Sequence, residues 1–364
     1  MHHVNREEAS LADYNMAIAF REKLRERLNE HDWLSNLAED LAAAYINRGI
    51  TLRALERLEE ALSDYSQAIA IREIIKEALQ EQWRPALDES LANAYSCRNR
   101  VLDSLNRSPE ALSDSVKAIS LRESLRESMS NEWPLEWMHN QASSYASMGT
   151  TLSKLDRPEE SLEAYSKSIC LGEQVHKILG EKWPSGWSED LATFYMVRGI
   201  LSKNLGHTED AILDYNEAIR LLEEALEKQG DFCRPAMLNR LAEVYNNRGV
   251  CFGTFNQIHT ALADFEISIF ISENLKARIG KAWRDSWNEG LRGSYLNRTK
   301  ALTEIARTTS AEHNQSPKGT IQSENDFAID YSSHARDIAL QKIKKFRLQR
   351  FLFQGVTQKN HKNS

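Results

Sequence analysis

The chain has 364 residues, of which 41% are hydrophobic, and its formal net charge is −7 at pH 7. Only 15 glycines and 7 prolines interrupt it, which favours long helices over a turn-rich β fold. No apolar run is long enough to cross a bilayer, and the polar start MHHVNREEAS differs from a secretory signal peptide. Four cysteines without metal-ligand spacing indicate reduced, buried thiols, so we expect a cytoplasmic protein.

Three sets of residues recur with a period of 50 positions. The first set is the tyrosines Tyr45, Tyr95, Tyr145, Tyr195, Tyr245 and Tyr295. Twelve residues before each stands one of Trp33, Trp83, Trp133, Trp183, Cys233 and Trp283. Twenty residues after the first five tyrosines stand Tyr65, Ser115, Tyr165, Tyr215 and Phe265. Since chance does not produce three registered sets, the chain is predicted to be a repeat array.

The first element in the chain matches a second helix of the repeat with no first helix before it, so residues 1–32 are interpreted as a partial unit. The uncovered face that this leaves is a candidate surface for self-association into a homo-oligomer. Residues 33–307 form the main array. The breaker-rich stretch 308–325 is predicted to be a loop. Residues 326–353 are predicted to be a closing helix and residues 354–364 a disordered tail.

Each complete unit is predicted to contain two helices joined by a short turn. Apolar residues in the segment 91–105 follow a helical period, and a second, more charged helix is expected over residues 110–129. Pro109 lies in the break between them and suits the first turn of a helix. Two helices of about 20 residues, each about 30 Å long, account for nearly the whole period.

Within a unit, an aromatic residue, a glycine, a second aromatic and two alanines have a distinctive spacing. In the first complete unit these residues are Tyr45, Gly49, Ala61, Tyr65 and Ala68. The fourth unit repeats them as Tyr195, Gly199, Ala211, Tyr215 and Ala218. The fifth has Tyr245, Gly249, Ala261 and Phe265, with Ser268 in the last place. Over roughly residues 7–305 the chain resembles the tetratricopeptide repeat, whose usual unit is about 34 residues.

This resemblance implies an all-α fold, a right-handed α-solenoid of antiparallel helix pairs, here with elongated helices. It also implies a non-catalytic scaffold or regulatory adaptor that binds a protein or peptide in a concave groove lined by the first helices. Carried onto this chain, the groove positions are Asn47, Arg53, Asn93, Arg100, Asp103, Thr150, Ser153, Thr193, Lys203, Asn246, Asn247 and Lys300. The family's clamp for a C-terminal carboxylate wants Lys one residue after the aromatic, where this chain has Ile46, Ser96, Ala146, Met196, Asn246 and Leu296. Binding of chaperone tails is therefore not expected.

Arginines near the glycine position stand 16 residues before aspartates in four units. The pairs are Arg48 with Asp64, Arg98 with Asp114, Arg198 with Asp214, and Arg248 with Asp264. In the third unit Met148 and Ala164 replace both partners together. Because a lone charge left in a helix interface costs about 3–5 kcal/mol, this joint loss predicts a structural ion pair within each unit. Asp330 is a candidate partner for Arg298. The alternative is that the arginines contact a ligand.

The tryptophans lie in the turns between units, and several are followed four residues later by a second one, as at Trp137, Trp187 and Trp287. We expect them to pack between neighbouring units. The alternative is an exposed aromatic ridge for a partner.

The last 27 residues carry a cluster of cations and no acidic residue. The cluster comprises Lys342, Lys344, Lys345, Arg347 and Arg350. One interpretation is a capping helix whose lysines are solvated. The other is a docking element for nucleic acid or an anionic membrane.

Catalytic signatures are absent from the sequence. It contains no G-x-S-x-G, no H-E-x-x-H, no Gly-rich phosphate loop and no Cys/His metal spacing. We therefore expect no enzymatic activity, no cofactor and no metal.

Overall fold

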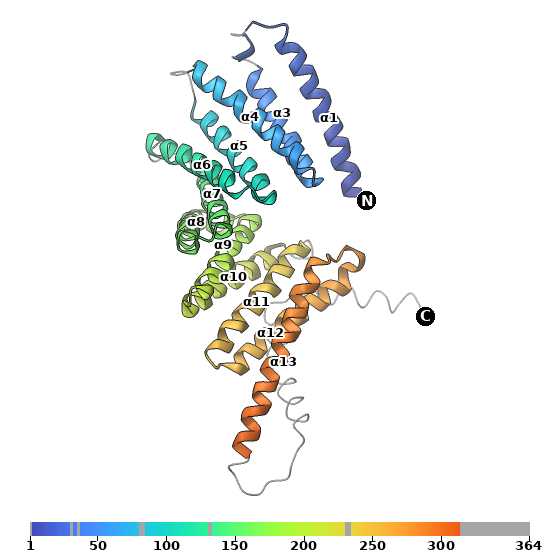
Figure 1. Cartoon of the computed structure of the whole chain (residues 1–364), viewed down its shortest axis with the longest axis vertical. Coiled ribbons are helices and arrows are strands. Elements are labelled where there is room, and N and C mark those ends of the chain that lie inside the picture. Colours follow the sequence, from blue (N-terminus) through green and yellow to red (C-terminus); the bar gives the residue numbers. More distant parts are fainter. Residues whose placement is uncertain are drawn as a thin grey trace, which may run out of the picture. The chain divides into compact units, whose positions relative to one another are not determined.

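The computed structural model describes residues 2–29, 32–34, 37–79, 84–129, 133–229 and 234–313. Within these ranges every regular element is an α-helix or a short 3₁₀ helix (Figure 1). The chain divides into two compact units, Met1–Ile178 and Leu179–Ser364, each of which is described by itself.

The first unit is built from seven described α-helices. They are α1 (His2–Arg25), α3 (Ala38–Ala54), α4 (Leu58–Leu79), α5 (Pro85–Ser104), α6 (Ser108–Met129), α7 (Leu135–Lys154) and α8 (Pro158–Leu179). The described part of the second unit begins with the 3₁₀ helix η3 (Gly180–Lys182). It continues with α9 (Ser185–Asn204), α10 (Thr208–Gln229), α11 (Pro235–Thr254), α12 (Ile258–Ile279), η5 (Gly280–Ala282) and α13 (Ser286–His313).

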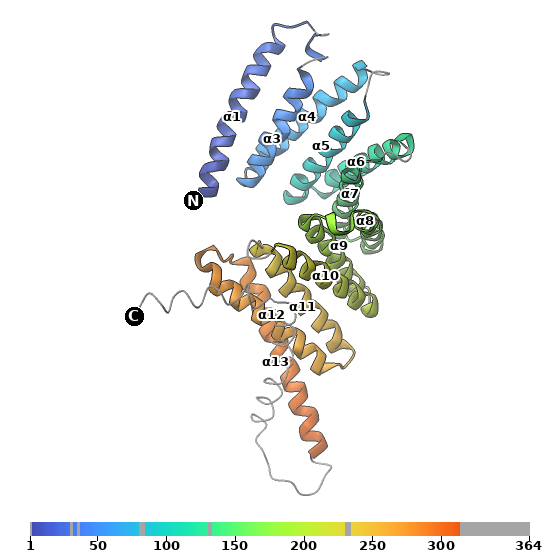
Figure 2. The same cartoon turned by 180° about the vertical axis from the view of Figure 1, so that it is seen from behind.

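Within each unit, consecutive helices pack against one another. In the first unit α3 pairs with α4 and α5 with α6, while α4 also packs on α5 and α6 on α7. In the second unit α9 pairs with α10 and α11 with α12, and α13 packs on α12. Figures 1 and 2 show this order of neighbours from opposite sides. The predicted all-α array of antiparallel helix pairs is confirmed.

A left-handed residue makes the turn inside each complete helix pair. The five residues with positive φ at this place are Glu56, Asn106, Asp156, Gly206 and Asn256. Glycine, asparagine and aspartate adopt this conformation at low cost, so four of the five turns use favoured residues. In the first turn the Arg57 N–H donates to the Leu52 carbonyl at 2.9 Å, which satisfies a carbonyl at the helix end.

The glycine and the second aromatic of the repeat meet between the two helices of a pair. A Cβ atom added to Gly49 would lie 2.6 Å from the Tyr65 ring, and one added to Gly199 would lie 2.8 Å from Tyr215. The same contact joins Gly149 to Tyr165 and Gly249 to Phe265. Because no side chain fits between ring and backbone, this contact fixes how closely the two helices approach.

The second complete unit replaces both partners of this contact. Asn99 stands where the other units have glycine, and Ser115 stands where they have the ring. The Asn99 amide donates to the Ser115 hydroxyl at 2.8 Å and to the Ala111 carbonyl at 2.7 Å. A larger residue on one helix thus compensates a smaller one on the other, and the buried amide is satisfied.

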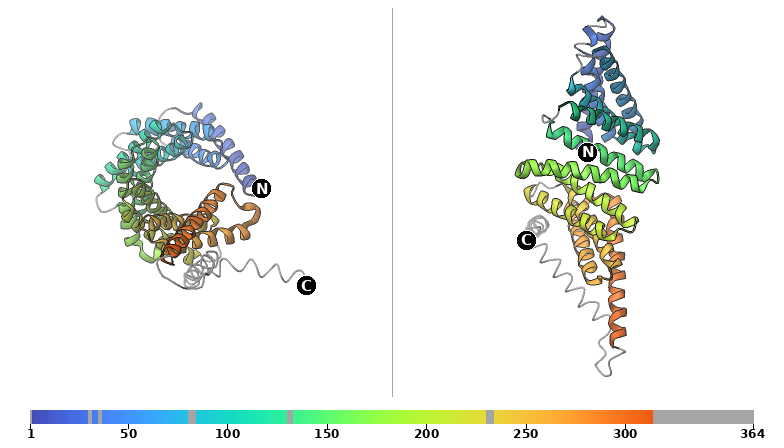
Figure 3. Two further views of the ribbon diagram at one scale, coloured as in Figure 1. Left: turned by 60° about the horizontal axis from the view of Figure 1, so that its bottom comes forward. Right: turned by 90° about the vertical axis from the view of Figure 1, so that its left-hand side faces the viewer.

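The last described helix is longer than the sequence predicted. α13 ends at His313, so residues 308–313 are helical rather than the start of the predicted loop. The Thr308 hydroxyl donates to the Ile305 carbonyl at 2.9 Å and the Thr309 hydroxyl to the same carbonyl at 2.7 Å, and the next proline is Pro317. Figure 3 shows the C-terminal part of α13 extending beyond α12. The rest of the loop, the closing helix and the tail lie outside the described residues.

The contact between glycine and ring can be tested at Gly199. We expect Gly199→Ala to lower the free energy of unfolding by about 1–3 kcal/mol, because the methyl group overlaps the Tyr215 ring. Gly253→Ala is the matched control, since nothing lies within 4 Å of its added Cβ, and we expect it to stabilise α11 by about 0.5–1 kcal/mol. Urea unfolding followed by circular dichroism measures both changes. Equal effects of the two substitutions would contradict this account.

Candidate partner-binding face

Within each unit, the first helices of successive pairs contact one another as well as their own second helices. α3 contacts α5 and α5 contacts α7 in the first unit, while α9 contacts α11 and α11 contacts α13 in the second. We use the name first-helix face for the twelve predicted groove positions. None of the twelve side chains is buried, whereas positions on the opposite sides of the same helices, such as Leu91 and Leu241, are. These positions are therefore accessible within their own units.

Three of the polar residues on the first-helix face of the first unit are bonded to neighbouring helices. The Asn93 side-chain oxygen accepts from Arg122 at 2.6 Å. Asp103 forms an ion pair with Lys154 at 2.7 Å. The hydroxyl groups of Thr150 and Tyr165 lie 2.7 Å apart. These residues hold the array together, whatever else they contact.

Two residues of the second unit have the same kind of role. Arg240 donates to the Thr193 hydroxyl, and the Asn297 amide donates to the Asn246 side-chain oxygen at 3.0 Å. Three of the twelve predicted positions, Asp103, Thr193 and Asn246, thus connect neighbouring repeats, whereas Asn93 and Thr150 bond to the second helix of their own pair.

The four cations of the first-helix face differ from these residues. Arg53, Arg100, Lys203 and Lys300 form no ion pair with any carboxylate of the described residues. Arg100 donates only to the Cys97 sulfur, at 3.4 Å. Since paired arginines are abundant elsewhere in the chain, these cations are the members of the face that are available to an anionic partner.

The four Arg–Asp pairs inferred from their spacing are formed in the structure. Each arginine donates through Nε and a terminal nitrogen to both oxygens of the aspartate. The shorter N–O distances are 2.7 Å for Arg48–Asp64, 2.7 Å for Arg98–Asp114, 2.6 Å for Arg198–Asp214 and 2.8 Å for Arg248–Asp264. The aspartates are buried in all four pairs. In the third unit, buried Ala164 occupies the aspartate position, so no carboxylate is left there.

Arg298 pairs with Glu266 of α12 at 2.5 Å. Asp330, its predicted partner, lies outside the described residues.

A second polar ladder joins neighbouring repeats and was missed in the sequence. Five of the six tyrosine hydroxyls of the 50-residue series donate to a glutamate on the preceding second helix: Tyr45 to Glu22, Tyr95 to Glu73, Tyr145 to Glu123, Tyr245 to Glu223 and Tyr295 to Glu273. Burial, together with the Glu22 contact, raises the pKa of Tyr45 to about 12, so the hydroxyl keeps its proton. The signal was present, because glutamate recurs every 50 residues from Glu73 to Glu273.

A buried arginine in the first unit was also missed. Arg122 of α6 is 0% exposed and donates to both oxygens of Glu89, at 2.9 and 3.0 Å. It also donates to the Ser144 hydroxyl at 2.7 Å, so it ties α5 to α7. Arg72 repeats the pattern with Glu39. The common separation of 33 residues, Glu39 to Arg72 and Glu89 to Arg122, could have suggested the pairing.

The first tryptophan of each described pair precedes a first helix, and the second lies in the first turns of that helix. Trp33 and Trp183 are buried, and the other described tryptophans are half-buried. Trp133 and Trp137 form an edge-to-face pair with centroids 5.7 Å apart, and the Trp183–Trp187 and Trp283–Trp287 pairs have the same geometry. Edge-to-face contacts of this kind stabilise a turn beyond the area that they bury.

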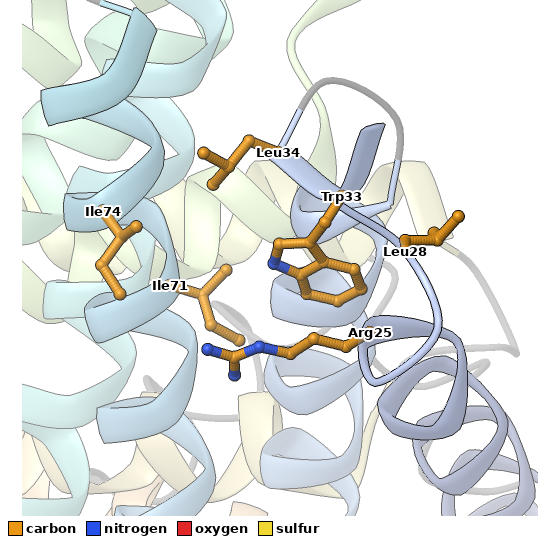
Figure 4. A pocket seen from close by; sticks show the side chains of 6 residues that line it. All are labelled: Arg25, Leu28, Trp33, Leu34, Ile71 and Ile74. Carbon is orange, nitrogen blue, oxygen red and sulfur yellow. The ribbon is translucent and has the colours of Figure 1, made fainter. Parts of the chain in front are cut away.

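The first tryptophan borders a cavity of about 270 Å³ in the first unit (Figure 4). Leu28, Leu34, Ile71 and Ile74 supply an aliphatic lining around Trp33. Arg25 lies over the indole ring, 5.6 Å from its centroid. The lining suits an apolar side chain.

The described residues offer little support for other kinds of site. They contain no group of three His, Cys, Asp or Glu side chains placed to hold a metal ion. In the same part of the chain no helix has the length and apolarity to cross a membrane. The prediction that the thiols are buried is wrong for Cys170, which is exposed on α8. The basic tail residues lie outside the described residues, and attachment through them to nucleic acid or membrane stays a prediction.

The structural role of the Arg–Asp pairs can be tested at Arg248 and Asp264. We expect Arg248→Met to lower the free energy of unfolding by about 3–5 kcal/mol, because the buried Asp264 carboxylate loses its ion-pair partner. Adding Asp264→Ala should recover part of that loss, as the Met148 and Ala164 pair indicates. Chemical denaturation of the single and double variants measures the coupling.

The exposed Arg157–Glu160 pair is the control, and its removal should change stability by less than about 1 kcal/mol. If the double variant Arg248→Met with Asp264→Ala is no more stable than Arg248→Met alone, the predicted energetic coupling between the two residues is wrong.

The sequence model of the family described as tetratricopeptide repeat matches residues 41–75, which cover most of α3 and α4. Comparison with curated proteins gives no match. Among solved structures, the chain is similar to BtubC from P. vanneervenii, with 12% identity and a TM-score of 0.48 over 87% of this chain and 96% of that one. It is similar to the apo form of RapI, with 16% identity and a TM-score of 0.47 over 84% and 99% of the two chains.

A third similar structure is YrrB, described as a TPR protein with an unusual peptide-binding site. Its identity is 19% and its TM-score 0.36, over 63% of this chain and 86% of that one. With identities below 20% and TM-scores below 0.5, these likenesses carry no weight for function.

The matched segment is one copy of a unit that the structure repeats. Its contact between Gly49 and Tyr65 recurs in the helix pairs α7–α8, α9–α10 and α11–α12, and its ion pair between Arg48 and Asp64 recurs in three further pairs. Residues 41–75 therefore match the tetratricopeptide-repeat family, and the structure repeats the contacts of this segment with a unit of 50 residues.

Proposed function

We propose that the chain is a non-catalytic scaffold that binds a protein or peptide on its first-helix face. The observation that carries this proposal is the contrast among the accessible polar residues of that face. Five of them bond to adjacent helices of the array, whereas Arg53, Arg100, Lys203 and Lys300 pair with no described carboxylate. Within each unit, a face built from packed helices binds a segment without losing much conformational entropy of its own.

A peptide library displayed on phage and selected against the full chain tests this proposal. Selected peptides are then measured by calorimetry against a charge-reversal variant, Arg53→Glu with Arg100→Glu and Lys203→Glu. We expect this variant to lose about tenfold or more in affinity, because three accessible cations become anions.

The matched control reverses three arginines in the turns of the helix pairs, Arg57, Arg107 and Arg157. The side chains of these three arginines are exposed to about the same extent, and each pairs with a glutamate three residues later. Removing such an exposed pair costs little stability. Equal loss of affinity in both triple variants would show a general charge effect and not a site. Failure to select any peptide would remove the support for the proposal.

A second candidate function is self-assembly through α1. Met16 and Phe20 lie one helical turn apart on α1 and are 67% and 64% exposed. At the position of Phe20 in internal second helices, Ile71 and Leu221 are buried, and Ile71 packs in one core cluster with residues of its own first helix, α3. A second copy of the chain that presents the same apolar face could cover it.

Sedimentation velocity over a range of concentrations tests this candidate. We expect the wild-type chain to gain mass with concentration, and Met16→Glu with Phe20→Glu to abolish the gain by placing charges on the apolar face. The control is Val116→Glu with Leu213→Glu, which changes two exposed apolar residues elsewhere. A wild-type mass that does not change with concentration would exclude self-assembly of this kind.

A further inference from the structure

The hydroxyl group of Tyr65 is buried and has no acceptor for its proton among the described residues. Tyr65 of α4 is 0% exposed and packs with Leu52, Cys97 and Val101 between α3 and α5, and the one side chain that contacts its hydroxyl as a hydrogen-bond partner, Arg53, is itself a donor. Burial raises the pKa of this hydroxyl far above its usual value, so it keeps its proton and remains a donor. An unsatisfied buried polar group is costly, and it needs an explanation.

Two cations of the first-helix face lie next to this hydroxyl. Arg53 of α3 stands one helical turn after Gly49, whose backbone lies against the Tyr65 ring, and as a hydrogen-bond donor it lowers the pKa of the hydroxyl. Arg100 of α5 donates to the Cys97 sulfur, which packs in the same cluster as Tyr65. The Cys97 sulfur, the other nearby polar group, already accepts from Arg100. The guanidinium groups and the hydroxyl are all donors, so the group missing from this site is an acceptor.

The other repeats show when the hydroxyl is left without a partner. Arg53 stands four residues after Gly49, and Lys203 stands four residues after Gly199. In the unit that contains Lys203, the Tyr215 hydroxyl is also buried without a partner among the described residues.

Where the cation is absent, the hydroxyl is satisfied or missing. Ser153 stands at the cation position of the third unit, and there Tyr165 bonds to Thr150 at 2.7 Å. Gly253 stands at that position in the fifth unit, and there Phe265 has no hydroxyl. A buried free donor therefore occurs in the units that also supply a cation, as a site for an anion requires.

We propose that Tyr65, Arg53 and Arg100 bind the carboxylate of an acidic side chain in a peptide that lies across α3 and α5. The inference rests on the proposed function and names the chemistry of its ligand. The carboxylate accepts from the hydroxyl and from the two guanidinium groups, and hydrogen bonds to a charged acceptor are stronger than neutral ones. Because Tyr65 is covered in the free chain, the long, exposed Arg53 side chain moves aside to admit the carboxylate and then closes over it. Asp103 does not oppose the ligand, since Lys154 neutralises it.

Fluorescence anisotropy with a defined probe tests the site in the full chain. The probe is a fluorescein-labelled peptide in which Glu alternates with Ser, and its partner has Gln in place of Glu. We expect the Glu peptide to bind at least about tenfold more tightly than the Gln peptide, and Tyr65→Phe, Arg53→Gln and Arg100→Gln each to weaken it by about tenfold.

Thermal unfolding separates this role from a structural one. Tyr65→Phe should unfold at the wild-type temperature or above, because it removes an unsatisfied buried hydroxyl while the ring stays against Gly49. Tyr165→Phe is the matched control, and it should unfold at a lower temperature and leave the affinity for the Glu peptide unchanged, since it breaks the bond to Thr150. Arg57→Gln removes the same charge as Arg53→Gln and should also leave the affinity unchanged.

Two results would overturn the assignment. Wild-type affinity of Tyr65→Phe and Arg53→Gln for the Glu peptide would show that the carboxylate binds elsewhere. Displacement of the probe by inorganic phosphate at constant ionic strength, with the same potency as by unlabelled Glu peptide, would show a site for a free anion. If library-selected peptides still bind the charge-reversal variant more weakly than the wild type, the proposed function stands even when either of these results overturns the carboxylate site. Failure of the site and failure of the proposed function are therefore distinguishable.

Discussion

The close approach of the two helices in each pair is the constraint on which the rest of this structure depends. A glycine on the first helix lets an aromatic ring of the second helix lie against its backbone, and the ring leaves no room for a Cβ atom. The same approach brings the arginine beside the glycine within reach of the aspartate next to the ring, so the buried ion pair follows from the packing. Since interiors are close-packed, a change on one helix requires a matching change on the other.

The repeats supply such matching changes within one chain. Asn99 replaces the small glycine and Ser115 replaces the large aromatic residue, and the Asn99 amide fills the space that the missing ring leaves. Met148 and Ala164 remove both members of the ion pair, which avoids an uncompensated buried charge. Joint replacement identifies these residues as structural, because each makes sense only with its partner.

Polar interactions also hold neighbouring repeats together within each unit. The tyrosine–glutamate ladder and the Arg122 network connect successive helix pairs, and Asp103, Thr193 and Asn246 do so on the first-helix face itself. Several polar residues of the first-helix face therefore serve to hold the helices together. The unpaired cations and the free tyrosine hydroxyls stand apart from this network, and they carry the functional proposals.

Much of the architecture could be predicted from the sequence, because the information lies in local spacing. Registered residues such as Tyr45 and Gly49 define the unit, and the fixed separation of Arg48 and Asp64 defines an ion pair inside it, since both ends belong to one helix hairpin. The end of α13 was misplaced, because the polar stretch after Arg307 contains no proline or glycine before Pro317 and the helix continues to His313.

The contacts between successive hairpins were decided only by the tertiary structure. Glutamates recur on many charged helices, so their spacing alone does not show that Glu123 lies opposite Tyr145. Only the packing of the helices brings these two side chains together across an interface. The same holds for the candidate site: the sequence by itself determined that Arg53 and Arg100 lie on first helices. Packing decided that their neighbour is the buried hydroxyl of Tyr65, because burial and the absence of an acceptor are properties of the assembled core.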